Sequence, residues 1–166
     1  MSAGLRRAEP EDLDFLAALY ADEAVRPFLA AAGRYGRDGI AEQLERDPEE
    51  GGVLVIELDG ERAGALLWER TNVRSRIAHV SGIAIHPDFR GRRLADDAAR
   101  LLQHHLIRER GFHRLELEIY GFNERALRHA ERSGFVREGV KRKAYLRHGD
   151  WVDAVLYSLL REDLEE

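Results

Sequence analysis

The chain has 166 residues, a length that suits one domain with a single hydrophobic core, and we predict one domain over residues 1–166. Apolar residues make up 44% of the chain and charged residues 34%, which excludes a disordered or membrane-embedded protein. The net charge of −5 argues against a general nucleic-acid binder and permits a cationic or amine substrate.

The sequence predicts neither a membrane span nor a secretory signal peptide. It has no apolar run of about 18 residues, and its first residues lack the apolar region of a signal peptide. The absence of cysteine excludes disulfides, thiolate metal ligands and a cysteine nucleophile. We therefore expect a cytoplasmic protein without a membrane or nucleic-acid partner.

The first half of the chain predicts two helical regions and a set of antiparallel strands. Pro10 and the acids that follow it favour a helix start, and Asp59-Gly60 is a hairpin signal. In chain order we expect a strand over 5–8, a helix over 10–22, a helix over 38–46, and strands over 53–58, 63–70 and 77–85.

The second half predicts one strand–helix–strand unit and then further strands. Asn123 is well suited to cap a short helix that Ser133-Gly134 closes. The expected elements are a helix from the arginine-rich turn to near Gly111, a strand over 114–120, a helix over 124–132, and strands over 135–138, 145–146 and 151–160. This order indicates a mixed α+β fold with one βαβ-like unit.

The segment from Val80 to Arg100 carries the strongest functional signal. An apolar strand ends at His86-Pro87, a turn with the sequence Arg90-Gly-Arg-Arg93 follows, and an amphipathic helix begins. The first N–H groups of a helix have no internal partner and carry partial positive charge. A helix start beside three arginines therefore predicts a site for a diphosphate.

The run Ile83-Ala-Ile-His-Pro-Asp-Phe-Arg-Gly-Arg-Arg-Leu-Ala95 resembles the acetyl-coenzyme A loop of the GNAT superfamily of N-acetyltransferases. Further segments match the same superfamily in register: Leu5–Asp12, Asn123–Ala126 with Glu131–Gly139, and Gly149–Asp153 with Val155–Leu159. Together they resemble the branch of ribosomal-protein alanine and polyamine acetyltransferases. The resemblance implies a single-domain GNAT-like fold, with a mostly antiparallel sheet of about six to seven strands flanked by about four helices.

The resemblance also implies a set of residues that bind coenzyme A. Backbone amides from Arg90 to Ala95 would receive the diphosphate, the strand edge at Ile83 and Ile85 would pair with the pantetheine arm, and Asn123 would contact that arm. The cofactor-binding residues that we expect are Ile83, Ala84, Ile85, Arg90, Gly91, Arg92, Arg93, Leu94, Ala95, Asn123 and Ala126.

Two positions depart from the family pattern. Arg93 stands where the loop usually has its first glycine, and its guanidinium could either hinder a phosphate or bind it; we favour retained binding. Ala130 stands where many relatives have a tyrosine that protonates the leaving thiolate. The proton donor must therefore come from elsewhere.

Acetyl transfer to an amine needs a proton acceptor and a proton donor. His79 is our candidate base, because it precedes Ile83 on the cofactor strand and an imidazole titrates near neutrality. Tyr120 and Tyr145 are candidate acids, and Glu116 and Glu118 are second choices for the base. Four aromatic residues could form the wall of an acceptor pocket, although core packing is the more common role of such residues: Phe28, Tyr35, Trp68 and Trp151.

We expect an acetyl-CoA-dependent N-acetyltransferase that acts on a primary amine by direct attack in a ternary complex, without a metal. The acceptor stays open among a peptide or protein α-amine, a polyamine and a small amine. The alternatives are a non-catalytic acyl-CoA binder, which Arg93 and Ala130 favour, and a nucleic-acid module built on the basic segment 141–148. Sheet edges near the C-terminus would allow a homodimer.

Overall fold

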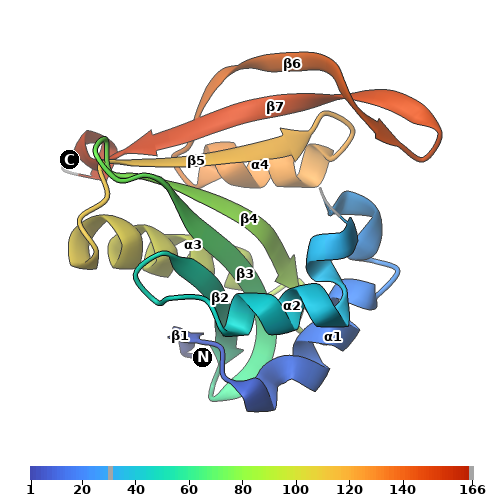
Figure 1. Cartoon of the computed structure of the whole chain (residues 1–166), viewed down its shortest axis with the longest axis vertical. Helices are drawn as coiled ribbons and strands as arrows, with labels where there is room; N and C mark the ends of the chain where they lie inside the picture. The colour runs from blue at the N-terminus through green and yellow to red at the C-terminus, as the bar shows by residue number, and fades with distance from the viewer. Residues whose placement is uncertain (30–31, 165–166) are drawn as a thin grey trace.

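A computed structural model describes residues 1–29 and 32–164 of the chain. One seven-stranded sheet runs through it, with the strand order β1-β2-β3-β4-β5-β7-β6 (Figure 1). The strands are β1 (Ala3–Arg7), β2 (Gly51–Leu58), β3 (Glu61–Asn72), β4 (Ile77–Ile85), β5 (Arg114–Tyr120), β6 (Val136–Arg147) and β7 (Asp150–Leu160). The helices are α1 (Leu13–Ala21), α2 (Arg37–Leu44), α3 (Leu94–Gln103) and α4 (Glu124–Arg132).

Neighbouring strands pair antiparallel except at one place. Strands β4 and β5 are parallel, and helix α3 connects them, so the predicted βαβ unit is confirmed. The α+β class and the mostly antiparallel sheet predicted for the fold are confirmed as well. Short 3-10 turns join several elements, including Arg26–Phe28 before α2 and Pro87–Phe89 before α3.

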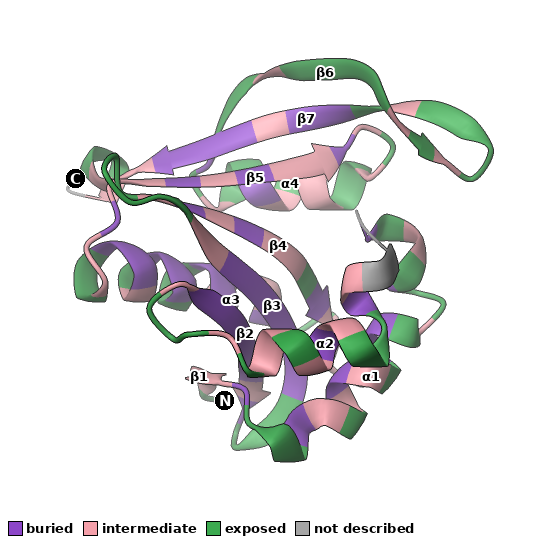
Figure 2. Cartoon of the chain, in the orientation of Figure 1, coloured by how far each residue is buried: buried purple, intermediate pink, exposed green. Residues whose placement is uncertain are grey.

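The two faces of the sheet are covered by different helices, and each face has its own core (Figure 2). The first core lies against α3 and α4 and contains buried residues such as Leu102, Leu115 and Tyr157. The second core lies against α1 and α2 and contains Leu16, Tyr20 and Ile40. This two-sided burial explains the nearly continuous apolar run of β2, in which all but one residue is buried.

The sequence predicted several elements with their observed ends. These are the strands Ile77–Ile85 and Arg114–Tyr120 and the helix Glu124–Arg132, which the Asn123 side chain caps by accepting a hydrogen bond from Ala126 N at 3.3 Å. The Asp59-Gly60 turn is confirmed too, with both residues at positive φ as a tight hairpin requires.

Other elements differ from the prediction in helix type or in extent. The helix predicted over 10–22 begins as a 3-10 turn, Pro10–Asp12, and continues as α1. The helix predicted to end near Gly111 ends close to that residue, but it changes at His104 into a π-helical turn over His104–Glu109. The fragments predicted at 135–138 and 145–146 are one long edge strand, β6. Its register slips twice against β7 and most of its residues are exposed, so it shows no regular alternation.

Within the described residues, no helix is long and apolar enough to cross a membrane.

Candidate active site

The candidate site lies where β4 and β5 separate. The two strands pair only from Ile77 to His79 on β4, whereas β5 pairs with β7 along its whole length. Beyond His79, no strand of the described residues pairs with this edge of β4. A cavity of about 1050 Å³ occupies this opening. Its lining includes Leu102 and Leu117 of the first core and Tyr35 and Ala84 of the second. The cavity therefore connects the two faces of the sheet.

A bulge in β4 aims its side chains at this opening. The register between β3 and β4 shifts between Ala65 and Leu67, so that β4 has one extra residue near Gly82, which has φ +62°. Before the bulge Val80 packs in the first core, and after it Ala84 packs in the second. Because the bulge inverts the alternation of the strand, Ile83 becomes partly exposed toward the cavity.

Glycine is required at the bulge. A Cβ on Gly82 would lie 2.6 Å from a ring carbon of Tyr35, and the positive φ disfavours any other residue. The Tyr20 hydroxyl donates a hydrogen bond of 2.7 Å to the Gly82 carbonyl, and its ring packs against Tyr35. The bulge is thus fixed from the α1 side of the sheet.

The arginine-rich turn forms one end of the cavity. Arg93 is the N-cap of α3 and has a left-handed backbone, φ 54° and ψ 22°. It lines the cavity together with Gly91, Leu94 and Ala95, so the free N–H groups at the start of α3 face the opening. Two aspartates in the first turn would oppose an anion there, but Asp96 is paired with Arg132 at 2.9 Å and Asp97 with Arg100.

The three arginines of the turn have different partners. The Arg90 guanidinium donates to the carbonyls of Ile85 and Ala24, each at 3.4 Å, and so braces the turn. The Arg92 guanidinium lies 5.5 Å from the centre of the Phe89 ring and does not line the cavity. Arg93 is therefore the residue of this trio whose side chain is best placed to meet an anion.

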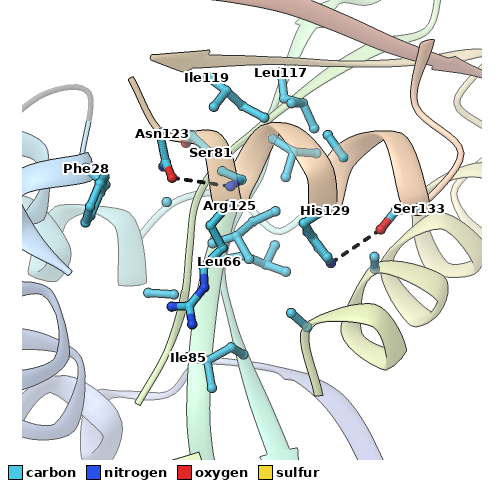
Figure 3. Close-up of a pocket in the computed structure, with 18 of the residues that line it drawn as sticks. Phe28, Leu66, Ser81, Ile85, Leu117, Ile119, Asn123, Arg125, His129 and Ser133 are labelled. Atoms are coloured by element: carbon cyan, nitrogen blue, oxygen red, sulfur yellow. Dashed lines mark hydrogen bonds between the residues drawn. The ribbon is translucent and has the colours of Figure 1, made fainter. Parts of the chain in front are cut away.

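Helix α4 lies along the cavity (Figure 3). Asn123 and Ala126 line it near the start of the helix, and Arg125 extends from α4 toward Ile85. Further along, the His129 ring lies 3.3 Å from the Ser133 hydroxyl and 3.3 Å from Asp96. Burial lowers the pKa of His129, although the Ala95 backbone and the Asp96 charge favour its protonated form.

His79 and Glu118 lie on the side of the cavity opposite α3. His79 is the last position of β4 that pairs with β5, and it lines the cavity. Glu118 accepts a hydrogen bond of 2.8 Å from the Tyr145 hydroxyl, and its other carboxylate oxygen forms an ion pair with the Lys141 ammonium nitrogen at 2.5 Å. Burial would raise the pKa of Glu118, but these two partners and the nearby His79 lower it overall. Glu118 is therefore negatively charged at neutral pH and already paired with its two partners.

Tyr120 is the centre of a group of aromatic rings. It is buried, stacks on Phe122 at 5.3 Å and contacts Tyr145 edge-on at 6.0 Å. Burial raises the pKa of Tyr120, Arg147 over its ring lowers it, and Glu118 raises it, with a net increase. The phenol therefore keeps its proton at neutral pH.

The structure brings most of the predicted residues to this cavity. Both catalytic candidates, His79 and Tyr120, line it, and so do all the predicted coenzyme-binding residues except Arg92. Of the four aromatic residues considered as pocket walls, Phe28 and Tyr35 line the cavity, whereas Trp68 is buried against Phe112 and Trp151 is exposed elsewhere.

The lining residues that sequence reasoning missed include Phe122, Arg125 and His129. The spacing of three residues from Ala126 could have placed His129 on the cavity side of α4. No residue near Phe122 in the sequence indicates that its ring packs against Phe28. Among the described ranges 1–29 and 32–164, no group of three histidine, aspartate or glutamate side chains is arranged to hold a metal ion.

The sheet that opens between β4 and β5, with a helix N-terminus at one end of the opening, defines an acyltransferase fold. Residues 3–136 match the acetyltransferase (GNAT) domain family. The chain therefore belongs to the GNAT family of acetyltransferases, and it is an N-acyltransferase.

Proteins with related sequences are named as N-acetyltransferases. The chain is 28% identical over 163 residues to the spermidine N(1)-acetyltransferase of Escherichia coli K12, covering 93% of this chain and 83% of that protein. It is 24% identical over 166 residues to a prophage-derived uncharacterized N-acetyltransferase of Bacillus subtilis, covering 97% and 91% of the two chains.

Solved structures show the same fold. The spermidine N-acetyltransferase of Vibrio cholerae, in complex with CoA and spermine, superimposes with a TM-score of 0.88 at 20% identity, covering 99% of this chain and 98% of that one. The ribosomal-protein-S5-alanine acetyltransferase of Vibrio fischeri gives a TM-score of 0.82 at 18% identity, covering 98% and 95%.

Proposed function

We propose that this chain transfers the acetyl group of acetyl-CoA directly to a primary amine that is bound at the same time. The observation that carries the proposal is the cavity through the sheet, which joins the free N-terminus of α3 on one face to His79 and Tyr120 on the other. A cofactor and an acceptor can enter such a site from opposite faces. No cysteine exists to hold the acetyl group between them.

The residues at the α3 end fit coenzyme A. A diphosphate needs backbone N–H groups and positive charge, which the start of α3 and Arg93 provide, while the neighbouring aspartates are neutralised by ion pairs. A pantetheine arm needs an unpaired strand edge and apolar walls. The edge of β4 beyond His79 and the lining residues Ile83 and Ala126 provide these.

The chemistry requires two proton transfers. When the amine nitrogen bonds to the acetyl carbon, the carbon–sulfur bond breaks, the nitrogen loses a proton and the sulfur gains one. We assign removal of the amine proton to His79, directly or through water. We assign delivery of a proton to Tyr120, because its burial keeps the phenol protonated and Ala130 offers no hydroxyl.

The test measures release of free thiol from acetyl-CoA in the presence of a panel of primary amines. We expect release that depends on the amine and saturates with it, and initial-rate patterns typical of a ternary complex. A protein that binds acetyl-CoA but releases no thiol with any amine would be a non-catalytic acyl-CoA binder. A double-displacement pattern would contradict direct transfer.

The acceptor is a primary amine in this proposal, and a polyamine is one candidate because two of the relatives are named for spermidine. Those relatives share less than a third of their residues with this chain. The selectivity for one amine over another must therefore come from the residues at the end of the cavity away from α3, where the acceptor would bind.

A further inference from the structure

The end of the cavity away from α3 is bordered by four aromatic side chains, Phe28, Tyr120, Phe122 and Tyr145, which we call the aromatic rim. Phe28 and Phe122 are 46% and 42% exposed, and their ring centres lie 6.0 Å apart. Two half-exposed phenylalanines side by side leave apolar surface uncovered at the cavity mouth. Such a surface favours a ligand with an apolar group that can cover it.

The aromatic rim is held in place from the β6–β7 hairpin. The Arg147 guanidinium donates to the carbonyls of Arg26 at 3.3 Å and Pro27 at 3.0 Å, and the His148 ring nitrogen lies 3.1 Å from the Pro27 carbonyl. These contacts fix the turn that carries Phe28. The same Arg147 lies 5.7 Å from the centre of the Tyr120 ring. The apolar surface is thus preformed and does not depend on a ligand to assemble it.

The charges around the aromatic rim do not suit a second ammonium group. In the described part of the chain, three carboxylates line the cavity: Asp96, Glu118 and Glu124. Asp96 lies at the α3 end, and the Glu124 side chain is 79% exposed to solvent. Glu118 is closest to the rim, where Lys141 and Tyr145 occupy both its oxygens. A polyamine would find this anion already neutralised.

We propose that the acceptor is a primary amine close to an aromatic or bulky apolar group and without a second positive charge, such as an arylalkylamine or the α-amine of a peptide that begins with phenylalanine. This proposal rests on the proposed function. The ring would cover Phe28 and Phe122 while the amine reaches His79. Burial of one ring in an apolar pocket gives a preference of about tenfold to a hundredfold over an amine that lacks it.

The first experiment compares kcat/KM for phenethylamine, butylamine and spermidine by thiol release. We expect phenethylamine to exceed both by at least about tenfold. Phenylalanine amide and alanine amide, compared in the same assay, distinguish a peptide α-amine from a small arylalkylamine. Spermidine equal to or better than phenethylamine would overturn the inference while leaving N-acetyl transfer intact.

Variants then test the residues. Phe28→Ala and Phe122→Ala should each lower the ratio of phenethylamine to butylamine turnover about tenfold, whereas Phe28→Leu should largely restore it. Trp151→Ala is the matched control, because this exposed aromatic residue lies outside the cavity, and the ratio should not change. Lys141→Ala should raise spermidine turnover about fivefold by freeing Glu118. An unchanged ratio in both phenylalanine variants, with melting temperatures like that of the wild type, would overturn the inference.

Calorimetry gives a readout that does not need turnover. In CoA-saturated protein, phenethylamine should bind at least about tenfold more tightly than spermidine. Equal or weaker binding would contradict the inference even if no amine were acetylated, and a lack of thiol release alone would contradict only the proposed function.

Discussion

The Tyr20 hydroxyl donates a 2.7 Å hydrogen bond to the carbonyl of Gly82, and this contact ties helix α1 to the bulge of β4. The Tyr20 side chain is buried, and its hydroxyl satisfies a carbonyl at the bulge, where the register of the strand ladder shifts. Because the bulge decides which side chains of β4 face the cavity, α1 helps to shape a site that it does not line.

Gly82→Ala should destabilise the protein and weaken coenzyme A binding. The new Cβ would lie 2.6 Å from the Tyr35 ring, and the left-handed backbone costs a non-glycine residue about 1–2 kcal/mol before any clash. We expect a loss of about 2–4 kcal/mol in the free energy of unfolding, measured with urea. Gly139→Ala is the control, because Gly139 has open space around its Cβ position and no positive φ. Equal denaturation midpoints for the two variants would contradict the assigned role of Gly82.

Asp12 should make stability depend on acid pH. This buried carboxylate accepts hydrogen bonds from Arg6 at 2.7 and 2.8 Å and from Arg62 at 2.8 Å, and its hydrogen bonds with Arg6 lower its pKa to about 2 from 3.8 despite burial. The folded-state pKa is depressed, so the contribution is complete above about pH 4 and disappears as the pH falls toward 2.

Because Arg6 and Arg62 are partly exposed, solvent screens their interaction with Asp12. We therefore expect Asp12 to contribute about 1–2 kcal/mol to the free energy of unfolding. Asp12→Asn should lower the free energy of unfolding by that amount at pH 7 and flatten its decline between pH 4 and pH 2. Unfolding curves recorded at several pH values measure both effects. Parallel pH profiles for the two proteins would rule out the linkage.

Substitutions of Arg93 distinguish the effect of its strained backbone on stability from the effect of its charge on CoA binding. Arg93→Gly should raise the free energy of unfolding by about 1 kcal/mol, because glycine adopts the left-handed N-cap without a Cβ penalty. Arg93→Gly and Arg93→Ala should both weaken CoA binding about tenfold and reduce its salt dependence, while Arg93→Lys should lose less. Calorimetric titration at two salt concentrations measures these changes. Wild-type affinity in the alanine variant would mean that the backbone amides suffice for the diphosphate.

His79→Gln should lower kcat/KM about a hundredfold at pH 7, the scale of a lost general base. The deficit should shrink as the pH rises toward the pKa of the acceptor, since more of the amine is then neutral without help. His104→Gln, at an exposed position on the helix after α3, is the matched control. A deficit that does not change with pH would assign His79 to positioning rather than proton transfer.

The parts of the site that could be predicted from the sequence are those that depend on near neighbours. The alternation of Leu115, Leu117 and Ile119 marks β5, Asn123 marks the start of α4, and the arginine-rich turn marks the start of α3. Each signal comes from residues within a few positions of one another, whose backbone dihedrals and caps are decided locally.

The parts that could not be predicted depend on contacts between distant segments. Arg90 and Arg92 look equivalent to Arg93 in the sequence, but the fold turns them to backbone carbonyls and to Phe89. The long edge strand β6 has few apolar residues to mark it. Phe28 and Phe122 are far apart in the sequence and lie side by side in the fold, where Arg147 at the end of β6 holds the turn that carries Phe28.

The sequence by itself determined the α+β class and the order of the elements, and it predicted a diphosphate site at the turn from Arg90 to Ala95. Only the tertiary structure decided that β5 leaves β4 after His79 and pairs along its length with β7. The physical reason is that a strand edge can hydrogen-bond to any exposed edge, so the choice of neighbour follows from how the whole sheet buries its two faces. That choice leaves the edge of β4 free and opens the cavity that the arginine-rich turn lines at one end and the aromatic rim at the other.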